Sequence, residues 1–328
     1  MLKSYLSSIP SSSNESVSNA SLPPYTGRWS IPSSTYEDFL VKYAECVDSG
    51  EKLHMTELHT EYAPIIIDID FRFSIDKGLE RCYNHDFLVD FVAVYNEVLE
   101  QYFQLSDDML NSFIFEKPSP VKDNGYIKDG IHIMYPNIVS NPEVQYDIRN
   151  LVIRKCVEKN TFKNIGHINK LEDVIDEAVI KKSGWFMYSS SKSNRDPYTL
   201  TLILNKNGEQ MIIPKMTTFE KVKAFSIRKS EDNCTRIKSE MSKRREIQPK
   251  QYIKPSGSID NLNGLDNNEI SIAEKLVSIL NKDRADDRSS WLDIGICLFN
   301  VDSSLINVWD TFSKQSTKYK KGECEKQW

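Results

Sequence analysis

The stretch Pro64-Ile65-Ile66-Ile67-Asp68-Ile69-Asp70-Phe71-Arg72-Phe73 decides the fold class, because it combines a buried strand with two acids. Its three consecutive isoleucines favour a packed, pleated strand, since β-branched side chains fit that surface. Beyond them apolar and polar residues alternate, which puts Asp68, Asp70 and Arg72 on one face. The stretch therefore predicts a core strand that ends in two neighbouring carboxylates.

These two carboxylates need a counter-charge. Like charges this close repel one another, and desolvating them is costly unless a cation lies between them. Carboxylate oxygens are ligands that Mg²⁺ and Mn²⁺ prefer. Asp68 and Asp70 are therefore candidate metal ligands. The alternative is a strand with one hydrated face, on which both acids contact only water.

Length and charge limit the classes of protein to consider. The chain has 328 residues, enough for a large core and for two domains, and its net charge is −5. Any nucleic-acid site must therefore be a local basic patch. No apolar run is long enough to cross a membrane, and the N-terminus lacks the apolar core of a signal peptide. We therefore expect an intracellular protein with no membrane partner.

Two common kinds of site are missing from the sequence. The six cysteines form no C-x-x-C pair and are typical of reduced thiols rather than a disulfide framework. No G-x-x-x-x-G-K-[ST] motif occurs, so a phosphate loop for ATP hydrolysis is absent.

Composition divides the chain into four segments. Residues 1–24, rich in Ser, Asn and Pro, predict a disordered arm, and residues 25–218 interleave strand and helix patterns, as in an α+β or α/β body. Residues 219–268 are first basic and then rich in Ser, Gly and Asn, which predicts a flexible connector. Its densest basic point, Lys243-Arg244-Arg245, is either a solvated linker or a DNA-contacting patch. Residues 269–328 have helical periodicity.

Within the body, hydrophobic periodicity predicts individual elements. A helix begins at the capping-box sequence Ser34-Thr35-Tyr36-Glu37 and ends at Gly50. Further helices are expected at 86–104 and 143–158, strands at 112–116, 130–136 and 185–188, and a hairpin between 200–204 and 211–213. A small second core is expected near the C-terminus from Trp291, Leu298, Phe299, Leu305, Val308, Trp309 and Phe312.

Four short motifs follow one another along the chain. Ile67-Asp68-Ile69-Asp70 is followed by Lys128 and Gly130-Ile131-His132, then by Ile175-Asp176, and then by Ser190-Ser191-Lys192 after an aromatic strand. This order resembles the catalytic core of archaeo-eukaryotic primases, in the primase-polymerase branch. The signature of that family is an hDhD strand, an s-x-H strand and an hD strand.

The C-terminal segment carries a second resemblance. Ala285-Asp286-Asp287-Arg288, with Trp291 and Trp309, looks like the small helical domain that follows primase domains in primase-helicases of large DNA viruses. Together the two resemblances imply an α+β primase core with an RRM-like antiparallel sheet and flanking helices over 25–218. A small all-α domain would follow, and the chain would be the N-terminal part of a primase-helicase.

The resemblance implies which residues carry the chemistry. Asp68, Asp70 and Asp176 would hold Mg²⁺ or Mn²⁺, and two metals about 4 Å apart can assist a 3′-hydroxyl and a leaving pyrophosphate. Asp173 or Glu177 could be the third ligand instead, with Asp176 as a helix cap. The incoming nucleotide would be bound by Lys128, Gly130, His132, Lys192 and Arg72.

Two positions depart from the family pattern. Gly130 stands where Ser is common, which removes a hydroxyl contact. Trp185-Phe186-Met187 stands where arginines are frequent. A nucleotide-contacting cation is therefore expected from elsewhere, either Arg72 or the basic connector.

These implications predict a nucleotidyltransferase. It would be a metal-dependent DNA primase/polymerase that copies single-stranded DNA with NTPs or dNTPs, and it would work with a helicase module in the host cytoplasm or nucleus. A non-catalytic single-stranded nucleic-acid-binding module is the alternative from another class, since aromatic and basic side chains can hold a strand without metal. A two-metal nuclease would share the carboxylates. The acid pair disfavours a pure binder, and the triphosphate-facing His132 disfavours a nuclease.

Overall fold

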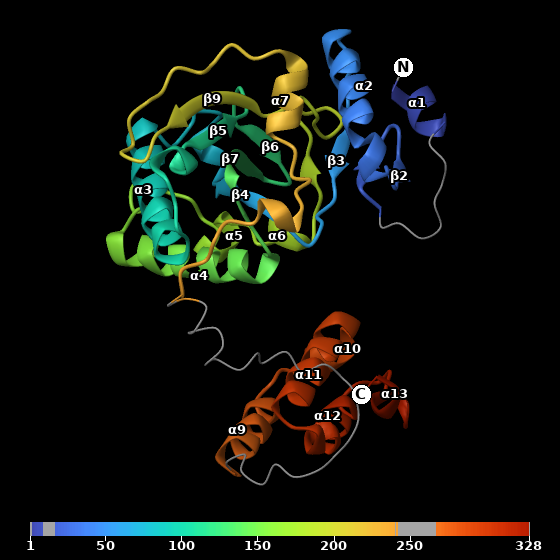
Figure 1. Ribbon diagram of the computed structural model, residues 1–328. Helices are drawn as coiled ribbons and strands as arrows, with labels where there is room; N and C mark the ends of the chain where they lie inside the picture. The colour runs from blue at the N-terminus through green and yellow to red at the C-terminus, as the bar shows by residue number, and fades with distance from the viewer. Residues whose placement is uncertain (1, 9–16, 240, 242–266, 328) are drawn as a thin grey trace. The chain divides into compact units, whose positions relative to one another are not determined.

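The computed structural model describes residues 2–8, 17–239, 241 and 267–327, and the chain divides into two compact units. The first unit is Met1–Lys250 and the second is Gln251–Trp328. Figure 1 shows the mixed sheet-and-helix body of the first unit and the all-helical second unit. The predicted α+β class with a following helical domain is confirmed.

The first unit is built on a five-stranded antiparallel sheet. Its strand order is β4 (Ala63–Phe73), β7 (Tyr126–Ser140), β5 (Ser112–Glu116) and β9 (Thr199–Leu204), with β6 (Val121–Asp123) paired to β7. The two longest strands, β4 and β7, are direct neighbours along eleven residue pairs. The strand predicted from the isoleucine run is therefore an edge strand of this sheet, paired along its whole length with β7.

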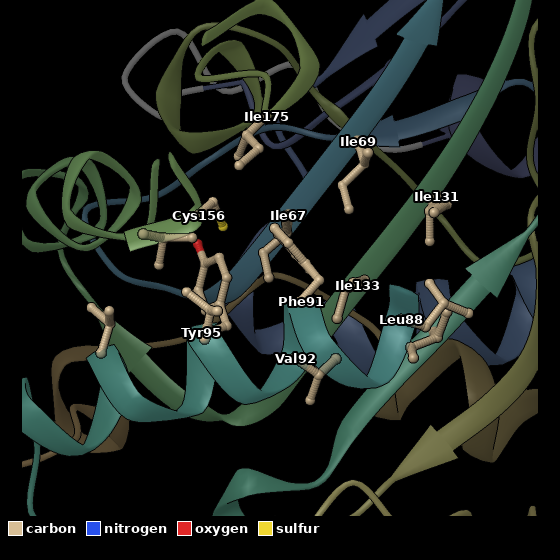
Figure 2. Packing of buried hydrophobic residues seen from close by; sticks show 14 of the residues in the cluster. Ile67, Ile69, Leu88, Phe91, Val92, Tyr95, Ile131, Ile133, Cys156 and Ile175 are labelled. Carbon is tan, nitrogen blue, oxygen red and sulfur yellow. The ribbon is translucent and has the colours of Figure 1, made fainter. Parts of the chain in front are cut away.

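Two helices cover one face of this sheet. They are α3 (His85–Tyr102) and α4 (Pro142–Lys159), close to the predicted helices 86–104 and 143–158. Figure 2 shows Phe91 and Tyr95 of α3 pointing toward Ile67 and Ile133 of the strands. Each such fully buried side chain contributes about 1.5–3 kcal/mol to folding. The alternation along β4 therefore places its apolar residues against the helices and its acids on the opposite face of the sheet.

A second, four-stranded sheet reaches over that other face. Its order is β2 (Gly27–Trp29), β1 (Asn19–Ser21), β3 (Met55–Glu57) and β8 (Trp185–Phe186), and it packs with α1 (Leu2–Ser8), α2 (Tyr36–Asp48) and α7 (Thr218–Ala224). Trp185, Phe225 and Ile227 bury the part of the first sheet that carries Ile66 and Met134. The end that carries Asp68 and Asp70 is left partly accessible.

Two predicted flexible segments are ordered where the structure describes them. Leu2 and Leu6 are buried against the second sheet's cluster, and Asn19 is a fully buried strand residue, so the arm prediction was wrong for 2–8 and 17–24. The connector prediction was wrong for 219–239, because Val222, Phe225 and Ile227 are buried among the lysines. The prediction rested on the basic composition of this segment and did not take account of the apolar residues spaced along it. Lys243, Arg244 and Arg245 lie outside the described residues.

Three local predictions were also wrong. Helix α2 has Thr35 as its N-cap, without a side-chain cap hydrogen bond, so the capping box at Ser34–Glu37 does not form. Residues 211–213 form no strand, although the chain turns back after β9 through an isolated bridge from Leu204 to Gln210 and a hydrogen bond from the Met211 N–H to the Ile203 carbonyl over 2.8 Å. The Ile175-Asp176 segment is likewise an isolated bridge between short helices rather than a strand. The remaining short elements are η1 (Ser33–Thr35), η2 (Ile75–Lys77), η3 (Asp107–Leu110), α5 (Leu171–Val174), α6 (Ala178–Lys181) and η4 (Glu231–Asn233).

The second unit has a core of its own. Its elements are α9 (Asn267–Ser278), α10 (Asp283–Asp286), α11 (Arg288–Val301), η5 (Ser303–Leu305), α12 (Ile306–Ser313) and α13 (Glu323–Gln327). Trp291 and Trp309 stack with ring centroids 4.6 Å apart, and Phe312 is buried with them. Phe299, predicted to be inside, is 45% exposed. Across the described part of the chain, every helix is too short or too polar to span a bilayer.

Candidate active site

The register between β4 and β7 brings two of the sequence motifs face to face. Asp68 pairs with His132, and Asp70 pairs with Gly130. Arg72 and Lys128 form the next such pair toward the end of the sheet. Directly opposed residues on antiparallel strands share one face and lie close together. Motifs about 60 residues apart in sequence therefore meet residue by residue.

The third acid reaches this site from the edge of β4. Ile175 bridges to Ile69, and the Asp176 backbone N–H donates to the Asp68 carbonyl over 2.9 Å. The buried guanidinium of Arg149 fixes the same loop by donating to the Ile175 carbonyl over 2.8 Å. Asp176 is thus held beside Asp68 by backbone contacts, even though the predicted strand is absent.

The structure distinguishes Asp176 from the two alternative ligands. Glu177 is engaged by Lys182 over 2.6 Å, and Asp173 is exposed. The charge of Asp176 is one of the charges that raise the pKa of Asp68. Asp176 Oδ1 also accepts from the Ala178 N–H over 2.9 Å, so the residue makes a capping contact as well. Of the three acids, Asp176 is therefore the candidate third ligand that the geometry favours.

Asp68 lies in a strongly unfavourable environment for a lone carboxylate. Burial, followed by the negative charges of Asp70 and Asp176, raises its pKa well above the usual range. Its Oδ1 atom is buried and has no hydrogen-bond partner among the described residues. A divalent cation would relieve both conditions, so the donor set fits Mg²⁺ or Mn²⁺.

The acids do not form a complete metal cage by themselves. In residues 2–8, 17–239, 241 and 267–327, no group of three or more His, Cys, Asp or Glu side chains is gathered closely enough to enclose an ion. Mg²⁺ in phosphate-transfer sites is commonly held by one or two carboxylates together with water and substrate phosphates. Asp68, Asp70 and Asp176 would therefore hold such an ion only together with water and substrate phosphates.

His132 is fixed between two aromatic rings. Its ring centroid lies 4.2 Å from that of Trp185 and 3.6 Å from that of Tyr198, with near-parallel planes. Two rings this close cannot occupy the same face, so they enclose the imidazole. Burial, and then the charges of Lys117 and Lys192, lower the pKa of His132 well below its usual value. The neutral ring points Nε2 toward Asp68 Oδ1 at 3.5 Å, too far and too poorly aligned for a hydrogen bond.

Gly130 is explained by Tyr198. A Cβ atom at Gly130 would lie 2.4 Å from the Tyr198 hydroxyl and 3.2 Å from Asp70 Oδ1. The glycine therefore makes room for a tyrosine that contributes its own hydroxyl at this point of the sheet. This accounts for the departure from the serine common in the family pattern.

The predicted cations differ in their surroundings. Lys192 is exposed, and its charge acts on both Asp68 and His132. Lys128 is paired with Asp123 at 3.3 Å, and Arg72 is exposed at the outer end of β4.

The serines of Ser190-Ser191-Lys192 hold the lysine's loop in place. The Ser190 hydroxyl lies 2.8 Å from the hydroxyl of Tyr43 and accepts from the Met55 N–H, and the Ser191 N–H donates to the Leu53 carbonyl. Lys192 is therefore presented on an anchored loop.

Sequence reasoning missed Lys117 and Tyr198. Lys117 directly follows β5, and its ammonium lies 4.6 Å from the Tyr198 ring centroid. Burial lowers the pKa of Lys117, although Asp70 and Asp68 oppose this. The available signal was a lysine directly after an apolar strand and before Pro118. Pairing information was needed to show that this strand neighbours the His132 strand.

Known proteins match both parts of the chain. Residues 18–204 match the family described as the C962R protein N-terminal AEP domain, and residues 273–328 match Primase C terminal 2 (PriCT-2).

Relatives occur in large DNA viruses. A protein of Acanthamoeba polyphaga mimivirus named "Putative helicase L207/L206" is 32% identical over 337 residues, covering 93% of this chain and 35% of the relative. "Putative helicase 184R" of Invertebrate iridescent virus 6 is 25% identical over 365 residues, covering 96% and 37%. The chain thus spans little more than a third of these curated relatives. It belongs to the archaeo-eukaryotic primase (AEP) family, with an AEP domain followed by a PriCT-2 domain, and is homologous to these viral proteins.

Proposed function

We propose that the protein is a metal-dependent DNA primase/polymerase, the N-terminal part of a viral primase-helicase acting inside the host cell. The supporting observation is the β4–β7 register, which opposes Asp68 to His132 and Asp70 to Gly130, with Asp176 held at the edge. Acids next to a neutral histidine and lysines suit a substrate that carries both phosphates and metal.

Each residue has a defined task in nucleotidyl transfer. Asp68, Asp70 and Asp176 would hold Mg²⁺ or Mn²⁺, which supplies charge stabilisation at the reacting α-phosphate. His132, fixed by its two aromatic neighbours, offers a ring N–H to the triphosphate. Lys192 neutralises phosphate charge, and Arg72 and Lys128 provide further positive charge toward the outer end of the sheet.

A primer-synthesis assay tests this proposal. It uses single-stranded template, labelled NTPs or dNTPs, and Mg²⁺ or Mn²⁺, with the Asp68→Ala/Asp70→Ala double variant alongside. We expect metal-dependent products from the wild-type chain and none from the folded variant. A pre-annealed primer in a parallel reaction separates initiation from extension.

Three outcomes would contradict the proposal. Synthesis by the double variant equal to that of the wild type would show that Asp68 and Asp70 take no part in the reaction. Template binding that persists in chelator, with neither initiation nor extension, would favour a non-catalytic binding module. Cleavage of DNA without added nucleotides would favour a nuclease.

A further inference from the structure

Lys117 directly follows β5, the strand that pairs with the His132 strand β7, and it lies at the same position along the strands as the site. Glu116, the last residue of β5, pairs with Ile131 of β7, so Lys117 stands opposite Gly130. Gly130 pairs on its other side with Asp70. Phe115, which pairs with His132, packs on the site-bearing face, and alternation puts Lys117 on that face too. The line across the sheet is therefore an acid, a glycine and a lysine.

The Lys117 ammonium is separated from His132 by a single ring. Its Nζ lies 4.6 Å from the centroid of Tyr198, whose opposite neighbour is the imidazole of His132, 3.6 Å away. Gly130 permits this arrangement, because any Cβ would collide with the Tyr198 hydroxyl. Within the described residues Nζ donates no hydrogen bond and makes no ion pair, so its donors are available to an anion.

The backbone of Lys117 is held rigidly. The guanidinium of Arg81 donates to the Lys117 carbonyl over 2.6 Å, to Glu116 over 2.9 Å and to Asp129 over 3.1 Å. This guanidinium therefore ties the end of β5 to β7 from the other face of the sheet. A cation on a fixed backbone loses less conformational freedom when it binds a ligand than one on a loop.

We propose that Lys117 is a triphosphate-binding residue of the nucleotide site, acting beside His132 and Lys192. This inference rests on the proposed function. It supplies the cation that was expected from outside the aromatic strand Trp185-Phe186-Met187. A lysine ammonium binds phosphate as a compact point charge, and Tyr198 holds it in place by a cation–π contact.

The test is direct binding of inorganic triphosphate, with Mg²⁺, to the full chain by titration calorimetry. Lys117→Met removes the charge at similar volume and is expected to weaken binding about tenfold or more, the range for a lost charge-assisted hydrogen bond. Lys117→Arg keeps the charge and should stay within about threefold of wild type. Lys122→Met is the matched control and should bind like wild type, because Lys122 pairs with Ile127 and so faces away from the site.

Primer extension gives a second readout that a merely structural role would not reproduce. Lys117→Met should raise the KM for nucleotide by a similar factor, while the Kd for primed template is unchanged. Wild-type binding of triphosphate together with equal binding by Lys117→Met would overturn the assignment of Lys117 alone. A wild-type chain that neither binds triphosphate nor extends a primer would overturn the proposed function, and this inference with it.

Discussion

The carboxyl group of Asp68 is buried, and its Oδ1 atom has no hydrogen-bond partner in the part of the chain that the structure describes. Its raised pKa, caused by burial and then by Asp70 and Asp176, means that ionising it in the folded state is costly. Asp68→Asn removes that cost, so we expect the free energy of unfolding to rise by about 1–3 kcal/mol in chelator. The variant should at the same time lose synthesis by roughly a hundredfold or more. Thermal unfolding and primer extension measure the two effects.

Added Mn²⁺ provides the control for this prediction. Metal should raise the melting temperature of the wild type and have much less effect on that of Asp68→Asn. The difference in melting temperature between the two proteins should therefore be smaller with Mn²⁺ than in chelator. If Asp68→Asn were less stable than wild type in chelator, the carboxylate would be a structural group and not a destabilised ligand.

Gly130 and Tyr198 should behave as a coupled pair. A Cβ at Gly130 would lie 2.4 Å from the Tyr198 hydroxyl, so Gly130→Ser should cost about 1–3 kcal/mol through overpacking. In a Tyr198→Phe background the hydroxyl is gone, and the same substitution should cost about 1 kcal/mol less. Chemical denaturation of the four proteins in this cycle measures the coupling. An equal cost in both backgrounds would place the clash elsewhere.

At the level of elements, hydrophobic periodicity was sufficient to predict those strands and helices whose own residues show a clear pattern. The alternation along β4 predicted which residues face the helices, and β5 begins and ends at the predicted residues. The predicted helices 86–104 and 143–158 are α3 and α4, since long apolar stripes are unambiguous.

Long-range pairing could not be predicted in the same way. No local sequence pattern indicates that Lys117 lies opposite Gly130, or that the Tyr198 hydroxyl lies against Gly130. The family resemblance, not periodicity, named Asp176, and its actual setting is a bridge held by Arg149. The sequence patterns and the family resemblance thus named the acids, His132 and Lys192 as candidate site residues, whereas Lys117, the cation proposed on the neighbouring strand, could be found only from the strand register.

The buried Glu57 of β3 joins the second sheet to the segment after α7. Its carboxyl group accepts hydrogen bonds from the Tyr36 hydroxyl, the Ser226 hydroxyl and the Ile227 N–H, each over 2.7 Å. Burial raises its pKa despite these contacts. Folding therefore favours the protonated form. The stability it contributes is full below the unfolded pKa of about 4.3 and is lost as the pH rises through the higher folded pKa.

The variant Glu57→Gln does not titrate and isolates this contribution. As the pH rises from about 4, the wild type should lose unfolding free energy relative to Glu57→Gln, by at most about 1.4 kcal/mol per pH unit. Urea denaturation at a series of pH values gives the two profiles. Parallel profiles would show that Glu57 keeps an ordinary pKa in the folded chain.

On the scale of the whole molecule, the two units have separate hydrophobic clusters, and each is expected to unfold as its own cooperative transition. Trp309 is 1% exposed, stacks on Trp291 and packs against Gly295, so Trp309→Ala should cost the second unit about 3–5 kcal/mol. For a unit this small, its transition should move down by at least about 10 °C. The transition of the first unit, and its shift on adding Mn²⁺, should stay where they are in the wild type.

Calorimetry records both transitions in one scan, and near-ultraviolet circular dichroism of the tryptophans identifies the one that moves. A single transition that shifts as a whole would mean that the two units depend on one another for stability, and that the candidate site in the AEP domain is sensitive to the state of the PriCT-2 domain.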